Sequence, residues 1–288
     1  MLFSLIVPSV GRPDDLERLF RTLDRQSLTD FHVIVVDQSR SNSLDSVIER
    51  YASKLDITHV RSRQRGAARA RNEGFSHARG AYVTWPDDDC FYDPDVLETA
   101  ARILREHQDW QAILGVPVDE NGSYYGRPPK PGVHRMSRFR SFYWGCEYTF
   151  FIRRSAFDAL GGYDEELGPG AGTDLWAGEQ TDLLLRASHA GIVAYFAPEL
   201  RVHHPNLSDV VVDAAAKRKL YHYAFAMGQV ARKNNLSALE STACVAMSFR
   251  AIVMACLRCN PNQIRIAIVR WQGLVSGLTK PYRSSAVV

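Results

Sequence analysis

The sequence is short of the features that mark secreted, fibrous or membrane-spanning chains. Only five of its 288 residues are cysteine, an odd number at irregular spacing, which argues against a secreted disulfide framework. No uninterrupted apolar stretch is long enough to span a bilayer, and the first residues lack the basic segment of a signal peptide. There is no low-complexity tract and no internal repeat. We therefore expect a cytoplasmic globular protein.

The cysteines also give little reason to expect metal or redox chemistry. Cys256 and Cys259 form a CxxC, but no second pair or histidine cluster accompanies them, and they follow a helical pattern. With 45% hydrophobic and 23% charged residues, the chain can bury the core of one large domain or of two modest ones.

Charge is distributed unevenly along the chain. From Arg201 onward there are 12 Lys or Arg and 3 Asp or Glu, which leaves 23 basic and 29 acidic residues in the first 200. Such a basic C-terminal part favours an anionic partner, either nucleic acid or a membrane surface. Since no aromatic platform or zinc-finger spacing accompanies the charge, we expect no nucleic-acid partner.

The first half alternates between strand and helix patterns. The expected strands cover residues 3–7, 31–37, 57–62 and 81–85, and the expected helices cover residues 14–26, 43–52, 67–78 and 93–107. The last of these helices is expected to begin at Asp93 with Pro94 in its first turn. Such alternation is typical of an α/β fold with a mainly parallel sheet flanked by helices.

The pattern loosens beyond Ile113. Residues 117–140 are rich in Pro, Gly and Arg and resemble an insertion or a long loop. A strand and a helix ending at Gly161 and Gly162 follow, then a glycine-rich loop, a helix over 179–190 and a strand over 192–197. After His204 only helices are expected.

Three adjacent acids, Asp87, Asp88 and Asp89, follow the strand over 81–85. Their mutual repulsion requires compensation by water, hydrogen-bond donors or a cation. The Pro-Asp-Asp-Asp run is also ordinary turn chemistry. Its position favours a site, because ligands collect at the carboxyl ends of strands in open α/β sheets.

Six spaced elements follow one another over residues 1–206: LIVPSVGRPDDLERLFRTLDRQS, VIVVDQS, RGAARARNEGFSHARGAYVTWPDDD, LGGYDEEL, GEQTDLLLRASHAG and RVHHP. Together and in this order, they resemble family 2 glycosyltransferases. The resemblance implies a Rossmann-like glycosyltransferase A catalytic domain over 1–206. Within it, residues 1–116 would bind the nucleotide sugar and residues 117–206 the acceptor, while residues 207–288 form a basic helical extension.

The resemblance also implies a donor site and a metal site. Asp37 would contact the nucleotide base, and the Asp-x-Asp motif maps onto Asp87, near the ribose or metal, and Asp89, the direct ligand of Mn²⁺ or Mg²⁺. Hard cations of this kind prefer carboxylate oxygens. His204, rather than His203, matches the family's further metal ligand. The remaining donor-binding residues implied are Pro8, Ser9, Arg12, Arg71, Asn72 and Asp88, although Arg71 can also be read as a solvated arginine on a helix face.

The acceptor side contains Glu179 and Asp182, which lie three residues apart near the start of a helix. Acids are also favoured at helix N-termini without any catalytic role. The family usually has Glu-Asp here with the Asp as base, whereas this chain has Gln180 in that place. We predict that Glu179 is the catalytic base, with Asp182 as the alternative.

The sequence therefore predicts an inverting, metal-dependent hexosyltransferase-like enzyme. A UDP-sugar is the favoured donor, and the acceptor is a hydroxyl of a glycan, a lipid-linked saccharide or a small molecule. The alternative is a catalytically inactive nucleotide-sugar or glycan-binding module of the same fold. The C-terminal extension mixes apolar residues with arginine, which fits either a peripheral contact on the inner face of the membrane or helices packed on the catalytic domain or at a homodimer contact.

Overall fold

The computed structural model describes residues 1–124, 129, 131–205 and 213–282. The chain divides into two compact units. The first, here called the sheet unit, comprises Met1–Arg65, Arg69–Tyr163 and Arg186–Asn206. The second, the helical unit, comprises Gly66–Ala68, Asp164–Leu185 and Leu207–Val288. The segment 164–185, which the sequence assigned to the catalytic domain, thus groups with the C-terminal helices.

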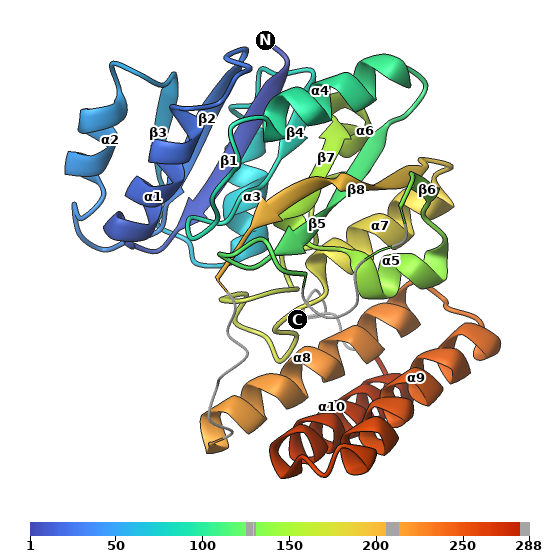
Figure 1. Cartoon of the computed structure of the whole chain (residues 1–288). Helices are drawn as coiled ribbons and strands as arrows, with labels where there is room; N and C mark the ends of the chain where they lie inside the picture. Colours follow the sequence, from blue (N-terminus) through green and yellow to red (C-terminus); the bar gives the residue numbers. More distant parts are fainter. Residues whose placement is uncertain (125–128, 130, 206–212, 283–288) are drawn as a thin grey trace. The chain divides into compact units, whose positions relative to one another are not determined.

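The sheet unit contains an eight-stranded sheet in the order β3-β2-β1-β4-β7-β5-β8-β6 (Figure 1). Its first four strands are parallel, and β1 and β2 run in register from Phe3 opposite Phe31 to Ser9 opposite Asp37. Ser9 and Asp37 therefore end side by side. The strands are β1 (Phe3–Ser9), β2 (Phe31–Asp37), β3 (Ile57–Arg61) and β4 (Tyr82–Thr84).

The other half of the sheet is mixed. Strand β7 is antiparallel to both β4 and β5, whereas β8 runs parallel to β5. The β5–β8 register shifts between Leu114 and Val116, and a Cβ added at Gly115 would lie 2.3 Å from the carbonyl oxygen of Leu200. The strands are β5 (Ala112–Val118), β6 (His134–Arg135), β7 (Phe150–Arg153) and β8 (Ala194–His203).

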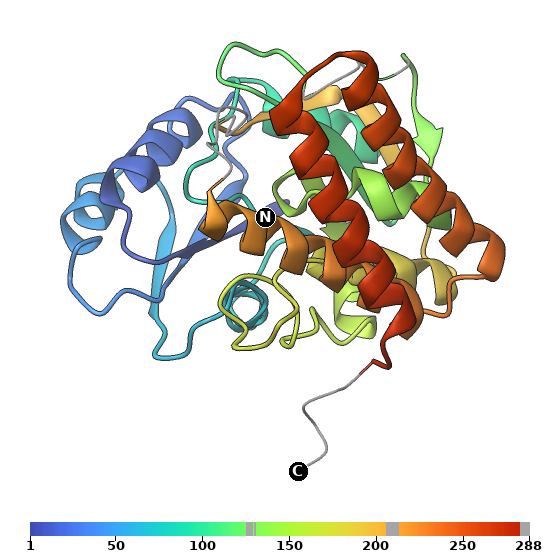
Figure 2. The same cartoon turned by 90° about the horizontal axis from the view of Figure 1, so that it is seen from below.

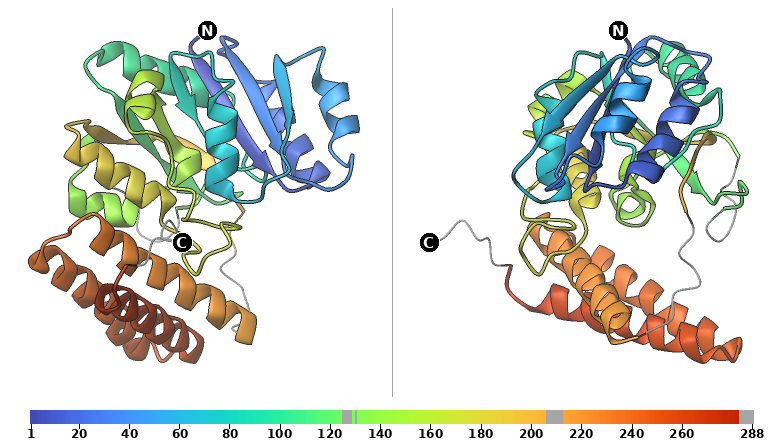
Figure 3. Two further views of the ribbon diagram at one scale, coloured as in Figure 1. Left: turned by 180° about the vertical axis from the view of Figure 1, so that it is seen from behind. Right: turned by 90° about the vertical axis from the view of Figure 1, so that its left-hand side faces the viewer.

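Helices cover both faces of the sheet, as Figures 1 and 3 show. Alternate residues of β1 and β2, such as Phe3 and Val33, pack with α1, α2 and α4 in one large core. On the opposite face Gly74 of α3 allows Ile6 and Val36 to approach closely. The helices are α1 (Pro13–Leu23), α2 (Asp45–Tyr51), α3 (Ala67–Phe75), α4 (Val96–Glu106), α5 (Arg138–Trp144) and α6 (Arg154–Ala159), with a short 3₁₀ turn at Glu147–Thr149.

Several boundaries differ from the sequence prediction; α1 and α3, for example, end at Leu23 and Phe75, each three residues before the expected end. Helix α4 begins at Val96 with Asp95 as its N-cap, so Asp93 and Pro94 lie before it. The backbone groups of both residues are used elsewhere, since their carbonyl oxygens accept from Gln26 and Ser27. Strand β8 continues to His203, six residues beyond the expected end, because its polar second half pairs with β5.

The helical unit is built on three helices, α8 (Ala214–Lys233), α9 (Ala238–Leu257) and α10 (Pro261–Thr279). Helix α10 packs against both of the others (Figure 2). It meets α8 at Gly228, Gly273 and Gly277, where an added Cβ would lie 2.2–2.5 Å from a backbone carbonyl oxygen of the facing helix. Helix α7 (Glu179–His189) begins in this unit.

Helix α9 is capped on its N-terminal side by a reciprocal pair. Ser237 accepts from the backbone of Glu240, and the Glu240 side chain accepts from the backbone of Ser237. Although Arg250 interrupts its apolar sequence, α9 is long and apolar enough to cross a membrane by length and composition alone. The sequence prediction that no stretch could span a bilayer rested on uninterrupted apolar runs, and Arg250 breaks this one.

Candidate active site

Polar side chains gather where three parallel strands of the sheet unit end. Ser9 ends β1, Asp37 ends β2, and the acids 87–89 follow β4. Because β1 lies between β2 and β4, these ends meet at one edge of the sheet. Pro8 lies one residue earlier in β1, opposite Val36, and is half-buried.

Asp88 is the internal anchor of this edge. Its carboxylate is fully buried and accepts hydrogen bonds from Ser9 Oγ at 2.6 Å and Arg12 Nε at 3.1 Å, with a second contact to Arg12 Nη2. Burial raises the pKa of Asp88 to about 7, an effect that Ser9 and Arg12 partly offset. This geometry gives Asp88 a positioning role, and its contact with a donor nucleotide remains a prediction.

Asp87, Asp89 and His204 form a cluster with the composition of a metal site. One ligand atom from each lies within 4.8 Å of the others. The Oδ1 atom of Asp89 is buried and accepts no hydrogen bond from the described residues, and it lies 3.3 Å from His204 Nε2. Two carboxylates and an imidazole are a donor set that Mn²⁺ accepts well, so these residues fit a divalent cation.

Strand pairing places His204 beside Asp87 and Asp89, although more than a hundred residues of sequence separate them. His203 exchanges backbone hydrogen bonds with Phe91, and the backbone N–H of His204 donates to Val118 at 3.0 Å. The imidazole of His204 then stacks on Tyr148, with ring centroids 4.8 Å apart.

The neighbouring histidine points to other partners. The His203 ring lies 3.1 Å from Asp93 through Nε2, 2.8 Å from the Asp119 carbonyl oxygen through Nδ1, and stacks on Phe91. Of the two histidines, His204 is the one beside Asp87 and Asp89, and its role as a metal ligand stays a prediction.

Basic side chains adjoin the cluster. Arg12 Nη1 donates to Asp89 Oδ2 at 2.9 Å, and the nearly buried Arg71 donates to Asp87 Oδ1 at 3.2 Å. Arg71 also lies over the ring of Tyr163. It is therefore a held side chain and not a solvated arginine on a helix face.

Asn72 is engaged with the backbone of the LGGYDEEL element. Its amide nitrogen donates to the carbonyl oxygen of Tyr163 at 2.9 Å, and its amide oxygen accepts from the N–H of Tyr163 at 2.8 Å. Gly162, with φ of 80°, lies so close that an added Cβ would be 2.7 Å from that oxygen. In this arrangement Asn72 holds the loop, and its predicted role at the nucleotide stays a prediction.

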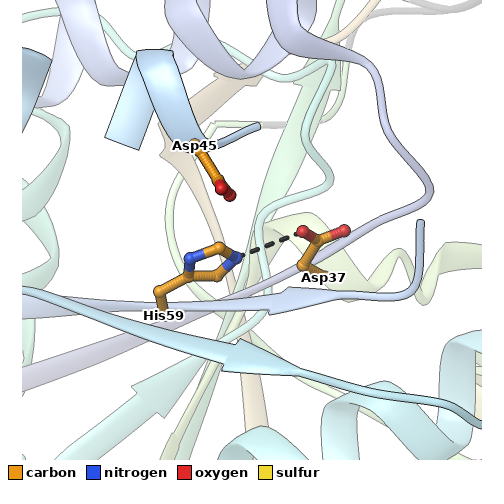
Figure 4. Close-up of side chains that lie close together, drawn as sticks. All are labelled: Asp37, Asp45 and His59. Carbon is orange, nitrogen blue, oxygen red and sulfur yellow. Dashed lines mark hydrogen bonds and ion pairs between the residues drawn. The ribbon is translucent and has the colours of Figure 1, made fainter. Parts of the chain in front are cut away.

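Asp37 lies in a second cluster, drawn in Figure 4. It is nearly buried, accepts from the backbone of Ser39 at 2.9 Å and lies 3.1 Å from His59 Nε2. Asp45 completes the cluster and is paired with Arg61 at 2.5 Å. A carboxylate fixed in this way at the end of β2 is suited to accept a hydrogen bond from a ligand.

The two candidate bases belong to the helical unit and differ in their surroundings. Glu179 is nearly buried beside Gly168, where an added Cβ would lie 2.7 Å from its carboxylate. Asp182 is fully buried, 2.8 Å from Lys233 Nζ, and accepts from Asn234 at 2.9 Å. The surroundings of Asp182 favour an anchoring role.

Sequence reasoning missed three residues at these sites. His59 and Asp45 lie beside Asp37, and Tyr148 stacks on the candidate metal ligand His204. The only available signal was the alternation in β3, which places His59 and Arg61 on one face. Nothing local in the sequence marks Tyr148.

Sequence comparisons identify relatives. The model of the family "Glycosyl transferase family 2" matches residues 4–161. The poly(ribitol-phosphate) beta-N-acetylglucosaminyltransferase TarS of Staphylococcus aureus is 29% identical over 111 residues, which are 37% of this chain and 19% of TarS. A PGL/p-HBAD biosynthesis glycosyltransferase of Mycobacterium tuberculosis is 24% identical over 57% of this chain and 63% of its own length. These alignments thus cover less than two thirds of either relative.

Solved structures share the fold over nearly the whole chain. Residues 1–349 of S. aureus TarS superpose with a TM-score of 0.62 at 17% identity, covering 95% of this chain and 92% of that one. The mannosyltransferase PcManGT of Pyrobaculum calidifontis, in complex with GDP-Man and Mn²⁺, gives a TM-score of 0.66 at 17% identity over 96% and 87%. With the family model covering more than half of its length, the chain belongs to glycosyl transferase family 2 and has the glycosyltransferase A fold.

Proposed function

We propose that this glycosyltransferase is an inverting, metal-dependent enzyme that uses a UDP-sugar as donor. The observation that carries the proposal is the cluster of Asp87, Asp89 and His204, in which the buried Oδ1 of Asp89 accepts no hydrogen bond from the described residues and lies 3.3 Å from His204 Nε2. Structures of this fold in complex with UDP-GlcNAc and with GDP-Man and Mn²⁺ add support.

Each part of the site has a task in a single displacement. Asp87, Asp89 and His204 would hold Mn²⁺ or Mg²⁺, which supplies charge neutralisation to a diphosphate leaving group. Arg12 and Arg71 lie beside these acids and add positive charge for the same group. Asp37 would accept a hydrogen bond from the nucleotide base.

The acceptor is a hydroxyl of a glycan, a lipid-linked saccharide or a small molecule. Its oxygen forms the new bond to the anomeric carbon as the bond from that carbon to the diphosphate oxygen breaks, and Glu179 takes the hydroxyl proton. Attack opposite the leaving group inverts the anomeric centre.

The metal assignment is tested by binding, without any need for the acceptor. Asp89→Ala should abolish the Mn²⁺-dependent part of UDP binding in calorimetry, while Asp95→Ala, an exposed acid six residues away, should retain it. Equal UDP affinity with Mn²⁺ and with EDTA in the unaltered protein would refute the metal.

The donor is identified by thermal shift with a panel of nucleotide sugars and Mn²⁺, because a ligand that binds only the folded state raises the midpoint. A UDP-sugar should give the largest shift, and that sugar should then be hydrolysed or transferred. Tight donor binding without any turnover, over a broad acceptor panel, would favour the alternative of a nucleotide-sugar-binding module.

A further inference from the structure

Helix α9 exposes its apolar residues in a continuous stripe. Positions 239, 246, 249, 253 and 257 recur at spacings of three, four and seven and therefore share one helix face. The exposed fractions along this face reach 81% for Leu239, 54% for Phe249, 42% for Val253 and 72% for Leu257. Met247 and Met254 extend the exposed surface on one side. We call Leu239, Met247, Phe249, Val253, Met254 and Leu257 the outer face of α9.

The inner face of the same helix is made mostly of small residues. Cys244 and Ala255 are buried, Ser241 and Ser248 are half-buried on the same face, and Ile252, a large apolar residue, is half-buried there as well. A surface helix of a globular protein normally places its large apolar residues inward and its polar residues outward. Helix α9 largely reverses this order. Apart from the ring contact of Phe249 with Trp271, at 6.5 Å between centroids, packing within the described part of the helical unit does not account for its outer face.

The charge around the outer face is basic except at the N-terminal end of α9, where Glu240 follows Leu239. Between residues 241 and 282 there are five basic residues and no acidic one. Arg250, Arg258 and Arg265 are exposed. Arginine beside an apolar stripe is the composition that binds anionic lipid headgroups while the apolar side chains enter the acyl boundary.

We propose that α9 docks its outer face on the surface of an anionic lipid bilayer, lying in the plane of the interface. The mid-helix position of Arg250 opposes a spanning orientation, because a charged side chain is costly at the bilayer centre. At the interface the same side chain reaches the headgroups. A second copy of the chain is a poorer occupant, because a symmetric contact between two such faces would bring arginines against arginines.

Flotation with vesicles tests the proposal on the full chain. At low salt the protein should float with vesicles containing phosphatidylglycerol and stay at the bottom with pure phosphatidylcholine, and high salt should weaken the binding. Phe249→Ser combined with Leu257→Ser should abolish flotation, as should Arg250→Gln combined with Arg258→Gln. Val133→Ser, an exposed apolar position in the sheet unit, should float normally.

The results of these measurements distinguish a lipid bilayer from a second copy of the chain as the partner of the outer face. The substituted side chains are exposed, so the thermal midpoint of each variant should match that of the parent; this checks that loss of flotation is not unfolding. Failure of the parent protein to float at low salt overturns the proposal. A dimer in light scattering that Phe249→Ser with Leu257→Ser dissociates, without vesicle binding, overturns it in favour of a second copy. Resistance of cell-membrane-bound protein to alkaline carbonate extraction overturns the in-plane orientation.

Discussion

Substitution of Lys233 by methionine tests how much the ion pair between Lys233 and the buried Asp182 contributes to stability. Lys233 Nζ lies 2.8 Å from Asp182 Oδ1 and 2.5 Å from Asp164 Oδ2. Asp182 is fully buried, so Lys233→Met removes a cation 2.8 Å from a carboxylate in the interior, while the Asn234 amide at 2.9 Å still donates to it. Breaking a buried ion pair on one side costs about 3–5 kcal/mol.

We expect the lower end of that range, about 3 kcal/mol, because Asn234 still donates to Asp182. At roughly 3 °C per kcal/mol, the thermal midpoint should fall by about 9 °C. Asp182→Asn should cost less, because it removes the buried charge and leaves Lys233 paired with Asp164. The double variant should then lose less stability than the sum of the two single changes.

Differential scanning fluorimetry and urea unfolding measure these losses. Lys217→Met, in the exposed first turn of the same helix, is the matched control and should change stability little. The reasoning fails if Lys233→Met is as mild as Lys217→Met. It also fails if Asp182→Asn melts like the parent but abolishes turnover, which would make Asp182 the catalytic base.

Three further predictions concern other parts of the molecule. Glu179→Gln should lower turnover roughly a hundredfold or more while donor affinity in calorimetry is kept; normal turnover would transfer the role of base to another group. Gly277→Ala should destabilise by about 1–3 kcal/mol in urea unfolding, because its Cβ would lie 2.2 Å from the Phe225 carbonyl oxygen, whereas Thr279→Ala should not. Burial, helped by the charge of Arg79, lowers the pKa of His32 in the folded protein below its value of 6.5 in the unfolded chain. The contribution of neutral His32 to the free energy of unfolding should therefore be full above pH 6.5 and decrease below it, because the unfolded chain takes up a proton there that the folded protein does not. His32→Gln should reduce this decrease in stability between about pH 7.5 and about pH 5.5.

Much of the sheet unit was predictable because its signals are local. The apolar runs of β1 and β2 and the helical spacing in α1 fix elements of the right type, and their parallel order places Asp37 and residues 87–89 at one edge. The choice of His204 came from a family pattern, and the structure places it beside Asp87 and Asp89.

What could not be predicted depends on partners distant in sequence. The polar second half of β8 is a strand only because β5 lies beside it. Asp182 resembles an ordinary acid at a helix start until Lys233, 51 residues later, is placed next to it. Burial of Asp88 likewise requires Ser9 and Arg12 to converge on it, which no pattern around residue 88 reveals.

The burial of Asp88 has a consequence for how this sequence can vary. Asp87 and Asp89 keep part of their side chains accessible, at 29% and 19%, whereas Asp88 has no exposed surface. If position 88 became apolar, the buried Ser9 hydroxyl would lose its acceptor, at a cost of about 1–3 kcal/mol, and the partly exposed Arg12 would lose its buried partner. Positions 9, 12 and 88 should therefore change together among related sequences, while positions 87 and 89 should follow the ligand that the enzyme binds. An alignment of relatives can separate these two patterns of covariation without any biochemical measurement.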